Sequence, residues 1–193
     1  MERWEEFEII LMQGRVRDIL TLIEGSPLRP ELERTPERVV NALAEMLDGY
    51  NVRIDDLFTT FEEEGKDMVI VVKDIPFVSW CEHHLLPFHG LASVAYLPVD
   101  KVIGASKIPR LVLAYAHRLQ LQERMSRQIA ETLMEKLQPQ GVAVIIEAEH
   151  LCMQCRGVKS VGSKLITSVM LGEFRENANL RAEILSLLSI RKL

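Results

Sequence analysis

The sequence lacks the features that would place the protein in a membrane, a secretory route or a nucleic-acid complex. No apolar run approaches the roughly 18 residues needed to cross a bilayer, and the acidic residues 1–6 lack a signal-peptide core. The net charge is −5, so no general excess of Lys and Arg favours nucleic acid or an anionic membrane. We therefore expect a cytoplasmic protein with no nucleic-acid and no membrane partner, in which local basic residues would have to hold any anionic substrate.

Cysteine is also scarce, and internal repeats and low-complexity segments are missing. The three cysteines are an odd number clustered near histidines, which favours a reducing compartment and a metal over a disulfide framework. The chain has 193 residues, of which 48% are hydrophobic. This is enough for one domain with a core and a helical extension.

All three cysteines and three of the five histidines lie in two short segments. The first is Cys81-Glu82-His83-His84, and the second is His150-Leu151-Cys152-Met153-Gln154-Cys155. Thiolates and imidazoles together are the ligand set that suits zinc. The sequence therefore predicts a zinc site built from these two segments.

The spacing within each segment predicts how the ligands are presented. Cys81 and His84 are three apart, so they can share a metal only across a turn or one helical turn. His150 and Cys152 follow the apolar run at residues 142–148, which is typical of a strand, and two apart on a strand means one face. Cys152 would then hold the metal while His150 beside it moves protons.

From spacing alone, three interpretations of the cysteines stay open. Cys152 and Cys155 form a C-x-x-C pair that could act in redox chemistry. Together with Cys81 and His84 they could instead close a structural site with four ligands. The third interpretation is a catalytic zinc with fewer protein ligands.

The N-terminal third is expected to be mostly helical. Apolar spacing predicts a helix over residues 2–24, which the break at residues 25–27 ends. Thr35 as N-cap and Pro36 in the first turn predict a second helix, which Gly49 ends. We interpret the apolar stripes of these helices as core, with an interface to another subunit as the alternative.

From Asp67 onward the pattern changes to strands mixed with helices. Strands are predicted at residues 68–72, 75–80, 91–97, 142–150 and 164–170. Residues 109–137 are expected to form one long or two shorter helices, and a last helix covers about 177–189. This order of elements predicts an α+β fold with an antiparallel sheet.

Several segments together resemble the GTP cyclohydrolase I family. They are residues 81–88 (CEHHLLPF), 106–110 (SKIPR), 118–124 (RLQLQER), 147–153 (EAEHLCM) and 156–158 (RGV), with the helix start at 35–39 and the ending at 172–175. The resemblance covers about residues 28–188, in order and without large gaps. Several independent motifs at matching intervals are far more specific than the zinc spacing alone.

The resemblance implies a fold, an assembly and a reaction. The fold is a T-fold, an antiparallel sheet backed by helices, over residues 51–193, with an N-terminal helical region over residues 1–50. The assembly is a toroidal homodecamer with active sites between subunits. The reaction is the zinc-dependent hydrolytic opening of the guanine ring of GTP, which releases formate and gives 7,8-dihydroneopterin triphosphate. The sequence leaves open whether this product feeds folate, biopterin or deazaguanine synthesis.

Carried over residue by residue, the resemblance implies the metal ligands and the acid–base groups. Cys81, His84 and Cys152 match the zinc ligands, and three protein ligands are typical of a catalytic zinc that keeps a fourth position open. His150 matches the histidine that moves a proton at the purine ring. His83 matches the one that works at the ribose ring oxygen, and histidine suits such acid–base work at cellular pH.

The resemblance also implies the residues that hold GTP. Glu123 matches the carboxylate that accepts hydrogen bonds from the guanine amide and amino group, with Gln122 beside it. Arginine forks and a lysine charge suit phosphate oxygens. The residues that match the triphosphate holders are Arg38, Lys107, Arg110 and Arg156, with Ser106 near the sugar.

Three positions depart from the family pattern. Asn41 stands where lysine is usual, which removes a phosphate contact one helical turn after Arg38. Ala105 stands where leucine is usual, which would loosen the guanine pocket. Cys155 stands where a small or apolar residue is usual, and we expect an inert thiol there, because a fourth protein ligand would block the open position of a catalytic zinc.

Two other functions remain as alternatives. One is a non-catalytic, zinc-stabilised T-fold oligomer, and the other is a different T-fold enzyme acting on pterins or deazapurines. The retention of His83, His150 and Glu123 argues against the first. The Cys-Glu-His-His run argues against the second.

Overall fold

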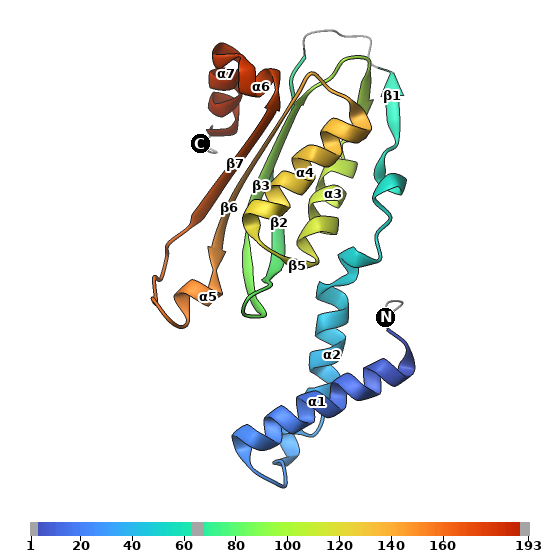
Figure 1. The fold of residues 1–193 in the computed structure, drawn as a ribbon, viewed down its shortest axis with the longest axis vertical. Coiled ribbons are helices and arrows are strands. Elements are labelled where there is room, and N and C mark those ends of the chain that lie inside the picture. Colours follow the sequence, from blue (N-terminus) through green and yellow to red (C-terminus); the bar gives the residue numbers. More distant parts are fainter. Residues whose placement is uncertain (1–3, 63–67, 190–193) are drawn as a thin grey trace. The chain divides into compact units, whose positions relative to one another are not determined.

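The computed structural model describes residues 4–62 and 68–189 and divides into two compact units, Met1–Val52 and Arg53–Leu193. The first unit is helical (Figure 1). Its elements are α1 (Glu6–Glu24), η1 (Pro30–Leu32), α2 (Thr35–Met46) and η2 (Asp48–Tyr50). The helices predicted for this third of the chain are confirmed.

Details at the helix ends differ from the sequence predictions. Thr35 is the first residue of α2 rather than its N-cap, which is Arg34, and no side chain caps this end. Gly49 does not end α2 either, because the helix stops at Met46 and Gly49 lies buried in η2. At the end of α1, Gly25 adopts a φ of 94°, a conformation that favours glycine.

The apolar stripe of α1 does not form a core within this chain. None of the residues of α1, all of which the structure describes, is buried. Its large apolar side chains are exposed: Phe7, Ile10, Leu11, Ile19, Leu22 and Ile23. The core interpretation is therefore wrong for this helix, whereas α2 buries Pro36 and Val40.

The second unit is built on a five-stranded sheet with the order β5-β2-β3-β6-β7. Its strands are β2 (Ile70–Cys81), β3 (Leu86–Leu97), β5 (Leu119–Gln120), β6 (Gly141–His150) and β7 (Leu165–Gly172). Neighbouring strands are antiparallel except for β5, which pairs in parallel with the end of β2. A separate ladder joins β1 (Thr60–Glu62) to β4 (Lys101–Ile103). The predicted α+β fold with an antiparallel sheet is confirmed.

Helices from the connections between its strands and from the segment after β7 accompany this sheet (Figure 1). The helical elements are η3 (Ile54–Leu57), α3 (Lys107–Ala116), α4 (Gln122–Leu137), α5 (Leu151–Gln154), α6 (Glu173–Glu176) and α7 (Ala178–Ser189). Residues 109–137 thus form two helices, separated by β5. Met125, Ile129 and Leu133, four residues apart along α4, are fully buried. A second cluster packs Phe174, Ile184 and other apolar side chains of α6 and α7 on the sheet.

The two strands predicted at 68–72 and 75–80 are one continuous strand. β2 pairs with β3 along its whole length, and its register shifts between Val72 and Ile75. Within this irregularity Asp74 has a φ of 56°, and its amide donates to Ser93 Oγ at 3.2 Å. A β-bulge of this kind interrupts the side-chain alternation without ending the strand.

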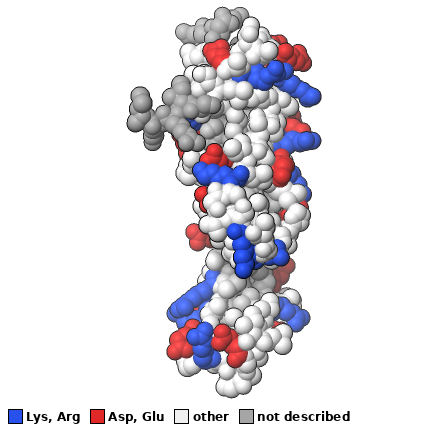
Figure 2. Space-filling model, turned by 90° about the vertical axis from the view of Figure 1, so that its left-hand side faces the viewer, with Lys and Arg blue, Asp and Glu red and all other residues white. Residues whose placement is uncertain are grey.

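The surface carries charges of both signs. On the face drawn in Figure 2, basic and acidic side chains are interspersed and do not gather into a field of one sign. None of the helices among the described residues is long and apolar enough to cross a bilayer.

A candidate active site at one end of the sheet

Two predicted ligand segments meet because the strands that carry them are linked through β3. Phe88 of β3 pairs with Ser79 near the end of β2 and with His150 at the end of β6. β2 ends at Cys81, and a tight turn follows in which the Leu85 amide donates to the Cys81 carbonyl at 2.9 Å. The turn required by the Cys81–His84 spacing is therefore present.

Cys81, His84 and Cys152 form a cluster that can hold a metal ion. One ligand atom from each residue lies within 4.8 Å of the other two. The Cys81 Sγ and His84 Nδ1 atoms are 3.7 Å apart. Ligands of a tetrahedral zinc lie ~3.3–3.8 Å apart, given its bonds of ~2.0–2.3 Å. The donor set and the spacing of the Cys81–His84 pair thus suit a metal ion.

Electrostatics at the two thiols also favour a cation. The pKa of Cys152 is raised, first by burial and then by the neighbouring Cys81. Burial disfavours a thiolate, and two adjacent thiolates repel each other. A bound cation would offset both the burial cost and the repulsion. The thiol pair is therefore better suited to metal binding than to standing free.

Cys152 reaches this cluster from a helical turn and not from a strand. β6 ends at His150, and the short helix α5 carries Cys152. The prediction that both side chains share one face of a strand is thus wrong at Cys152. Cys155 follows α5 as an exposed thiol and is not part of the ligand cluster found among the described residues.

Two arginines border the metal cluster. Arg156 Nη1 lies 3.1 Å from His84 Nε2, so Nδ1 is the His84 nitrogen that faces Cys81. Arg124 at the start of α4 binds both carboxylate oxygens of Glu82, with Nη2 to Oε1 at 2.9 Å. This hydrogen-bonded pair lowers the pKa of Glu82 and ties the ligand turn to α4. Nothing in the sequence predicts the Arg124–Glu82 pair, although both residues lie within the motifs that carry the family resemblance.

The imidazole of His150 is held between an aromatic ring and an amide. It stacks on Phe88 with ring centroids 4.5 Å apart and planes within 2° of parallel. Its Nε2 lies 2.9 Å from Gln122 Oε1. Burial lowers the pKa of His150, while the negative charge of Glu123 acts in the opposite direction. The structure thus brings His150, Gln122 and Glu123 together beside the metal cluster.

The remaining predicted residues are distributed unevenly around this centre. His83 is exposed on the ligand turn, with its ring centroid 6.1 Å from that of His84. Ser106, Lys107 and Arg110 lie at the N-terminal end of α3, whereas the other end of that helix leads into β5 beside Cys81. The segment preceding α3 contacts the far end of β3, where the Ile103 amide donates to the Tyr96 hydroxyl.

The chain therefore does not bring Lys107 and Arg110 to its own metal cluster. They lie at the start of α3, and it is the end of this helix, not its start, that leads into β5 beside Cys81 (Figure 1). Arg38 belongs to the N-terminal unit, where it is exposed on α2.

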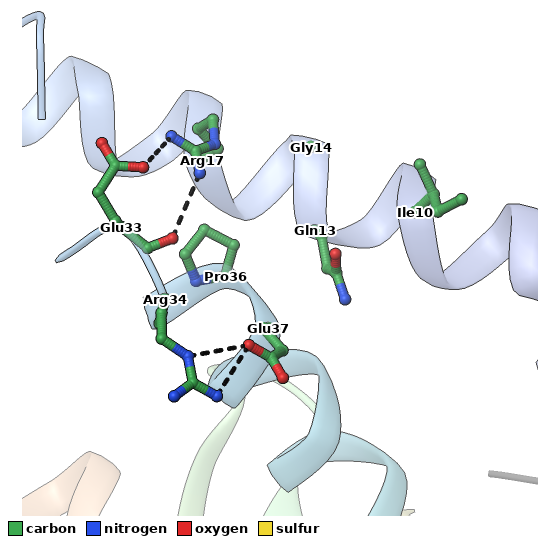
Figure 3. A pocket seen from close by; sticks show the side chains of 8 residues that line it. All are labelled: Ile10, Gln13, Gly14, Arg17, Glu33, Arg34, Pro36 and Glu37. Carbon is green, nitrogen blue, oxygen red and sulfur yellow. Dashed lines mark hydrogen bonds and ion pairs between the residues drawn. The ribbon is translucent and has the colours of Figure 1, made fainter.

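A pocket of about 500 Å³ in the N-terminal unit lies between α1 and α2 (Figure 3). Its charged side chains bind one another: Arg17 pairs with Glu33 at 3.1 Å, and Arg34 with Glu37 at 3.3 Å. Each of these arginines is already paired with a carboxylate, so the pocket is poorly suited to binding an anion. It contains none of the predicted site residues.

Comparisons with known proteins agree with the geometry. The family model described as GTP cyclohydrolase I matches residues 12–189. A protein of Thermoanaerobacter pseudethanolicus named GTP cyclohydrolase 1 is 48% identical over 178 residues, which cover 92% of this chain and 95% of that protein. A protein of the same name from Streptococcus thermophilus is 49% identical over 189 residues, 97% of this chain and 98% of its own.

Proposed function

The chain belongs to the GTP cyclohydrolase I family and has that family's activity, and from this premise we propose which of its residues carry the reaction. GTP is the substrate, water opens its guanine ring, and the products are formate and 7,8-dihydroneopterin triphosphate. The observation that carries the proposal is the Cys81–His84–Cys152 cluster with His150 and Glu123 beside it.

The metal is zinc, held by Cys81, His84 and Cys152. Mixed thiolate and imidazole ligands favour this ion, and Cys81 and His84 already lie at tetrahedral spacing. When bound, a zinc ion with three protein ligands supplies a Lewis acid and activates water at neutral pH. The second arginine near the turn, Arg124, keeps the ligand turn in place through Glu82.

The acid–base work falls to two histidines. His150 moves a proton at the purine ring, since it is stacked, hydrogen-bonded and adjacent to Cys152. His83, exposed on the ligand turn, acts at the ribose ring oxygen. Glu123, exposed at the start of α4 and close enough for its charge to act on His150, accepts the hydrogen bonds of the guanine amide and amino group.

The triphosphate is held by basic groups that come in part from a second copy of the chain. Arg156 already lies beside the metal cluster. Because Lys107 and Arg110 lie at the end of α3 that is farther from Cys81, a neighbouring subunit would supply them together with Ser106. Arg38 on α2 completes the set.

Self-association has further support on the surface of the chain. The apolar face of α1 is exposed. Leu91 and Ile166 are also exposed, and both pair with Glu147, so the three residues lie in one row across the sheet. Exposed apolar surface of this extent is typical of subunit interfaces. We propose a T-fold subunit in a toroidal homodecamer with its active sites between subunits.

The direct test is to incubate the zinc-loaded protein with GTP. Formate and a pterin that becomes fluorescent on oxidation are expected in equal amounts. A matched sample with ATP should give neither, because adenine lacks the donors that Glu123 would accept. Release of formate without a pterin, or no turnover with GTP, would contradict the proposal.

Chelation of the metal is expected to stop the reaction and leave the fold in place. The ligand cluster sits at one end of a sheet whose core is built from apolar side chains of β3, β6 and α4. Formate release should therefore fall to background, while far-ultraviolet circular dichroism keeps most of its helical signal. Unfolding on chelation, as in zinc fingers, would show instead that the metal is the scaffold.

Asn41→Lys is expected to strengthen GTP binding. Asn41 and Arg38 are exposed on α2 and three residues apart, so they share a face. A new charge-assisted phosphate contact, reduced by solvent screening, should contribute ~1 kcal/mol, or about fivefold in affinity. The apparent KM for GTP should fall a few-fold at low salt, and less at high salt.

The turnover number of Asn41→Lys should barely change, because the contact is remote from the ring and equal in ground and transition states. Steady-state kinetics at two salt concentrations measures both quantities. Asn51→Lys, in the same unit but after the end of α2, is a matched control for the added charge. An equal effect of both changes would contradict a contact at position 41.

A further inference from the structure

Gln122, the first residue of α4, is 1% exposed and has hydrogen-bond partners at both ends of its amide. Its Nε2 lies 3.0 Å from the carbonyl oxygen of Ile146 in β6 and 3.0 Å from that of Leu165 in β7. A third contact, at 3.2 Å, joins Nε2 to Thr167 Oγ1. Its Oε1 lies 2.9 Å from His150 Nε2.

These partners determine which way the Gln122 amide points. Backbone carbonyl oxygens only accept hydrogen bonds, so the two oxygens of Ile146 and Leu165 require the NH₂ group. A flipped amide would place its own oxygen against both carbonyls and leave three buried acceptors facing one another, which is costly. The side-chain oxygen must therefore face His150.

Neighbouring hydroxyls hold the same arrangement. Ser126 Oγ donates its hydrogen to the backbone carbonyl of Gln122 at 2.8 Å, so in its 2.7 Å contact with Thr167 Oγ1 the threonine is the donor. Thr167 Oγ1 then has lone pairs left to accept from Gln122 Nε2. The Gln122 NH₂ group has two hydrogens for three acceptors, so Thr167 Oγ1 shares one of these hydrogens with a carbonyl.

The direction of the amide fixes the state of the His150 ring. Since Gln122 Oε1 has no hydrogen, His150 Nε2 must carry one and donate it. Phe88 holds the plane of the ring by stacking at 4.5 Å. A half-turn of the imidazole would put a carbon in place of Nε2 and break the bond to Gln122, so the ring has one orientation.

We propose that Gln122 is a positioning residue that makes Nδ1 the His150 nitrogen that exchanges a proton with the substrate, and that Gln122 does not contact GTP, in place of the GTP-binding role that the resemblance implies for it. The proposal rests on the role of His150 given above. When Nδ1 gains a proton from the substrate or returns it, the Nε2–H···Oε1 bond is the same before and after. The ring therefore stays in place through the transfer, which is what an acid–base group needs.

Gln122→Leu tests this role by kinetics. It removes the acceptor of the His150 bond, and kcat for GTP should fall roughly 10- to 100-fold, the usual cost of losing a partner that orients a functional histidine. The KM should stay within about twofold, because ground-state binding is untouched. A rise in KM with little change in kcat would show that Gln122 contacts the substrate and would overturn the proposal.

Thr167→Val is the matched control. It removes a hydroxyl from the same buried network but leaves the Gln122–His150 bond. We expect a loss of melting temperature with kcat within about twofold of the unchanged chain. If Thr167→Val lowers kcat as much as Gln122→Leu does, the network acts only through stability and the proposal fails.

A spectroscopic measurement on the unchanged, zinc-loaded protein does not depend on either variant folding. Solid-state nitrogen NMR of chains labelled at the histidine ring nitrogens distinguishes a protonated from an unprotonated nitrogen. The His150 signals are identified by their loss in His150→Asn. A proton on Nε2 and none on Nδ1 of the neutral ring supports the proposal, and the reverse overturns it, whether or not His150 proves to act on the purine.

Discussion

Cys152→Ser is expected to lose the bound zinc and to lower formate release from GTP by roughly a thousandfold or more, while Cys155→Ser keeps both. Only Cys152 belongs to the ligand cluster with Cys81 and His84, whereas Cys155 is exposed after α5. Serine is a poor zinc ligand, and loss of the metal removes several kcal/mol of transition-state stabilisation; about 4 kcal/mol corresponds to the expected rate loss.

The two variants form a matched pair, because each replaces one sulfur by oxygen within three residues of the other. Zinc per chain, measured by mass spectrometry on dialysed protein, and formate release should separate them clearly. Circular dichroism of both should match the unchanged chain. Equal zinc loss in the two variants would mean a closed site with four protein ligands, and the catalytic assignment of the metal would then be wrong.

Glu123→Gln is the change with the second-largest expected effect. The guanine amide and amino groups are both donors, and a carboxylate accepts from both, whereas an amide offers one acceptor and one donor. A guanine donor left without its acceptor should lower kcat/KM by roughly 30- to 5,000-fold, which corresponds to a loss of ~2–5 kcal/mol of transition-state stabilisation. The position also suits the role, because Glu123 is exposed at the start of α4 beside His150.

Comparing GTP with ITP shows whether the loss comes from the guanine edge. ITP lacks the amino group, so the unchanged enzyme should prefer GTP strongly, and Glu123→Gln should narrow that preference. Glu131→Gln, an exposed glutamate farther along α4, controls for the lost charge and should behave like the unchanged chain. An unaltered GTP rate in Glu123→Gln would remove this residue from the site.

The secondary structure could be predicted well wherever one periodicity runs without interruption. α1 and α4 follow from side chains that recur at helical spacing, and β6 follows from a continuous apolar run, both local properties of the chain. β2 was split into two predicted strands because the bulge at Asp74 interrupts the alternation. That bulge depends on Ser93 of the next strand, whose hydroxyl accepts from the Asp74 amide, and a local pattern carries no information about such a partner.

The candidate site divides in the same way. The composition of the two cysteine-containing segments predicted a metal site, because few residue types bind zinc, and the family resemblance supplied the ligand set of Cys81, His84 and Cys152. The placement of Cys152 on a helical turn was missed, since four residues are too few to show helical periodicity. The sequence did not predict the role of Gln122. Gln122 is buried whereas its neighbour Glu123 is exposed, and the motif that contains both does not show this difference.

By itself, the sequence determined the family, the ligand set and the order of helices and strands, because these depend on residue type and on spacing along the chain. Only the tertiary structure decided which groups meet. Strand pairing brings His150 and Cys81 to one end of the sheet, while α3 carries Lys107 and Arg110 toward the other. It also decided that a buried amide faces His150, because this orientation depends on carbonyls of β6 and β7 that lie more than 20 residues away along the chain.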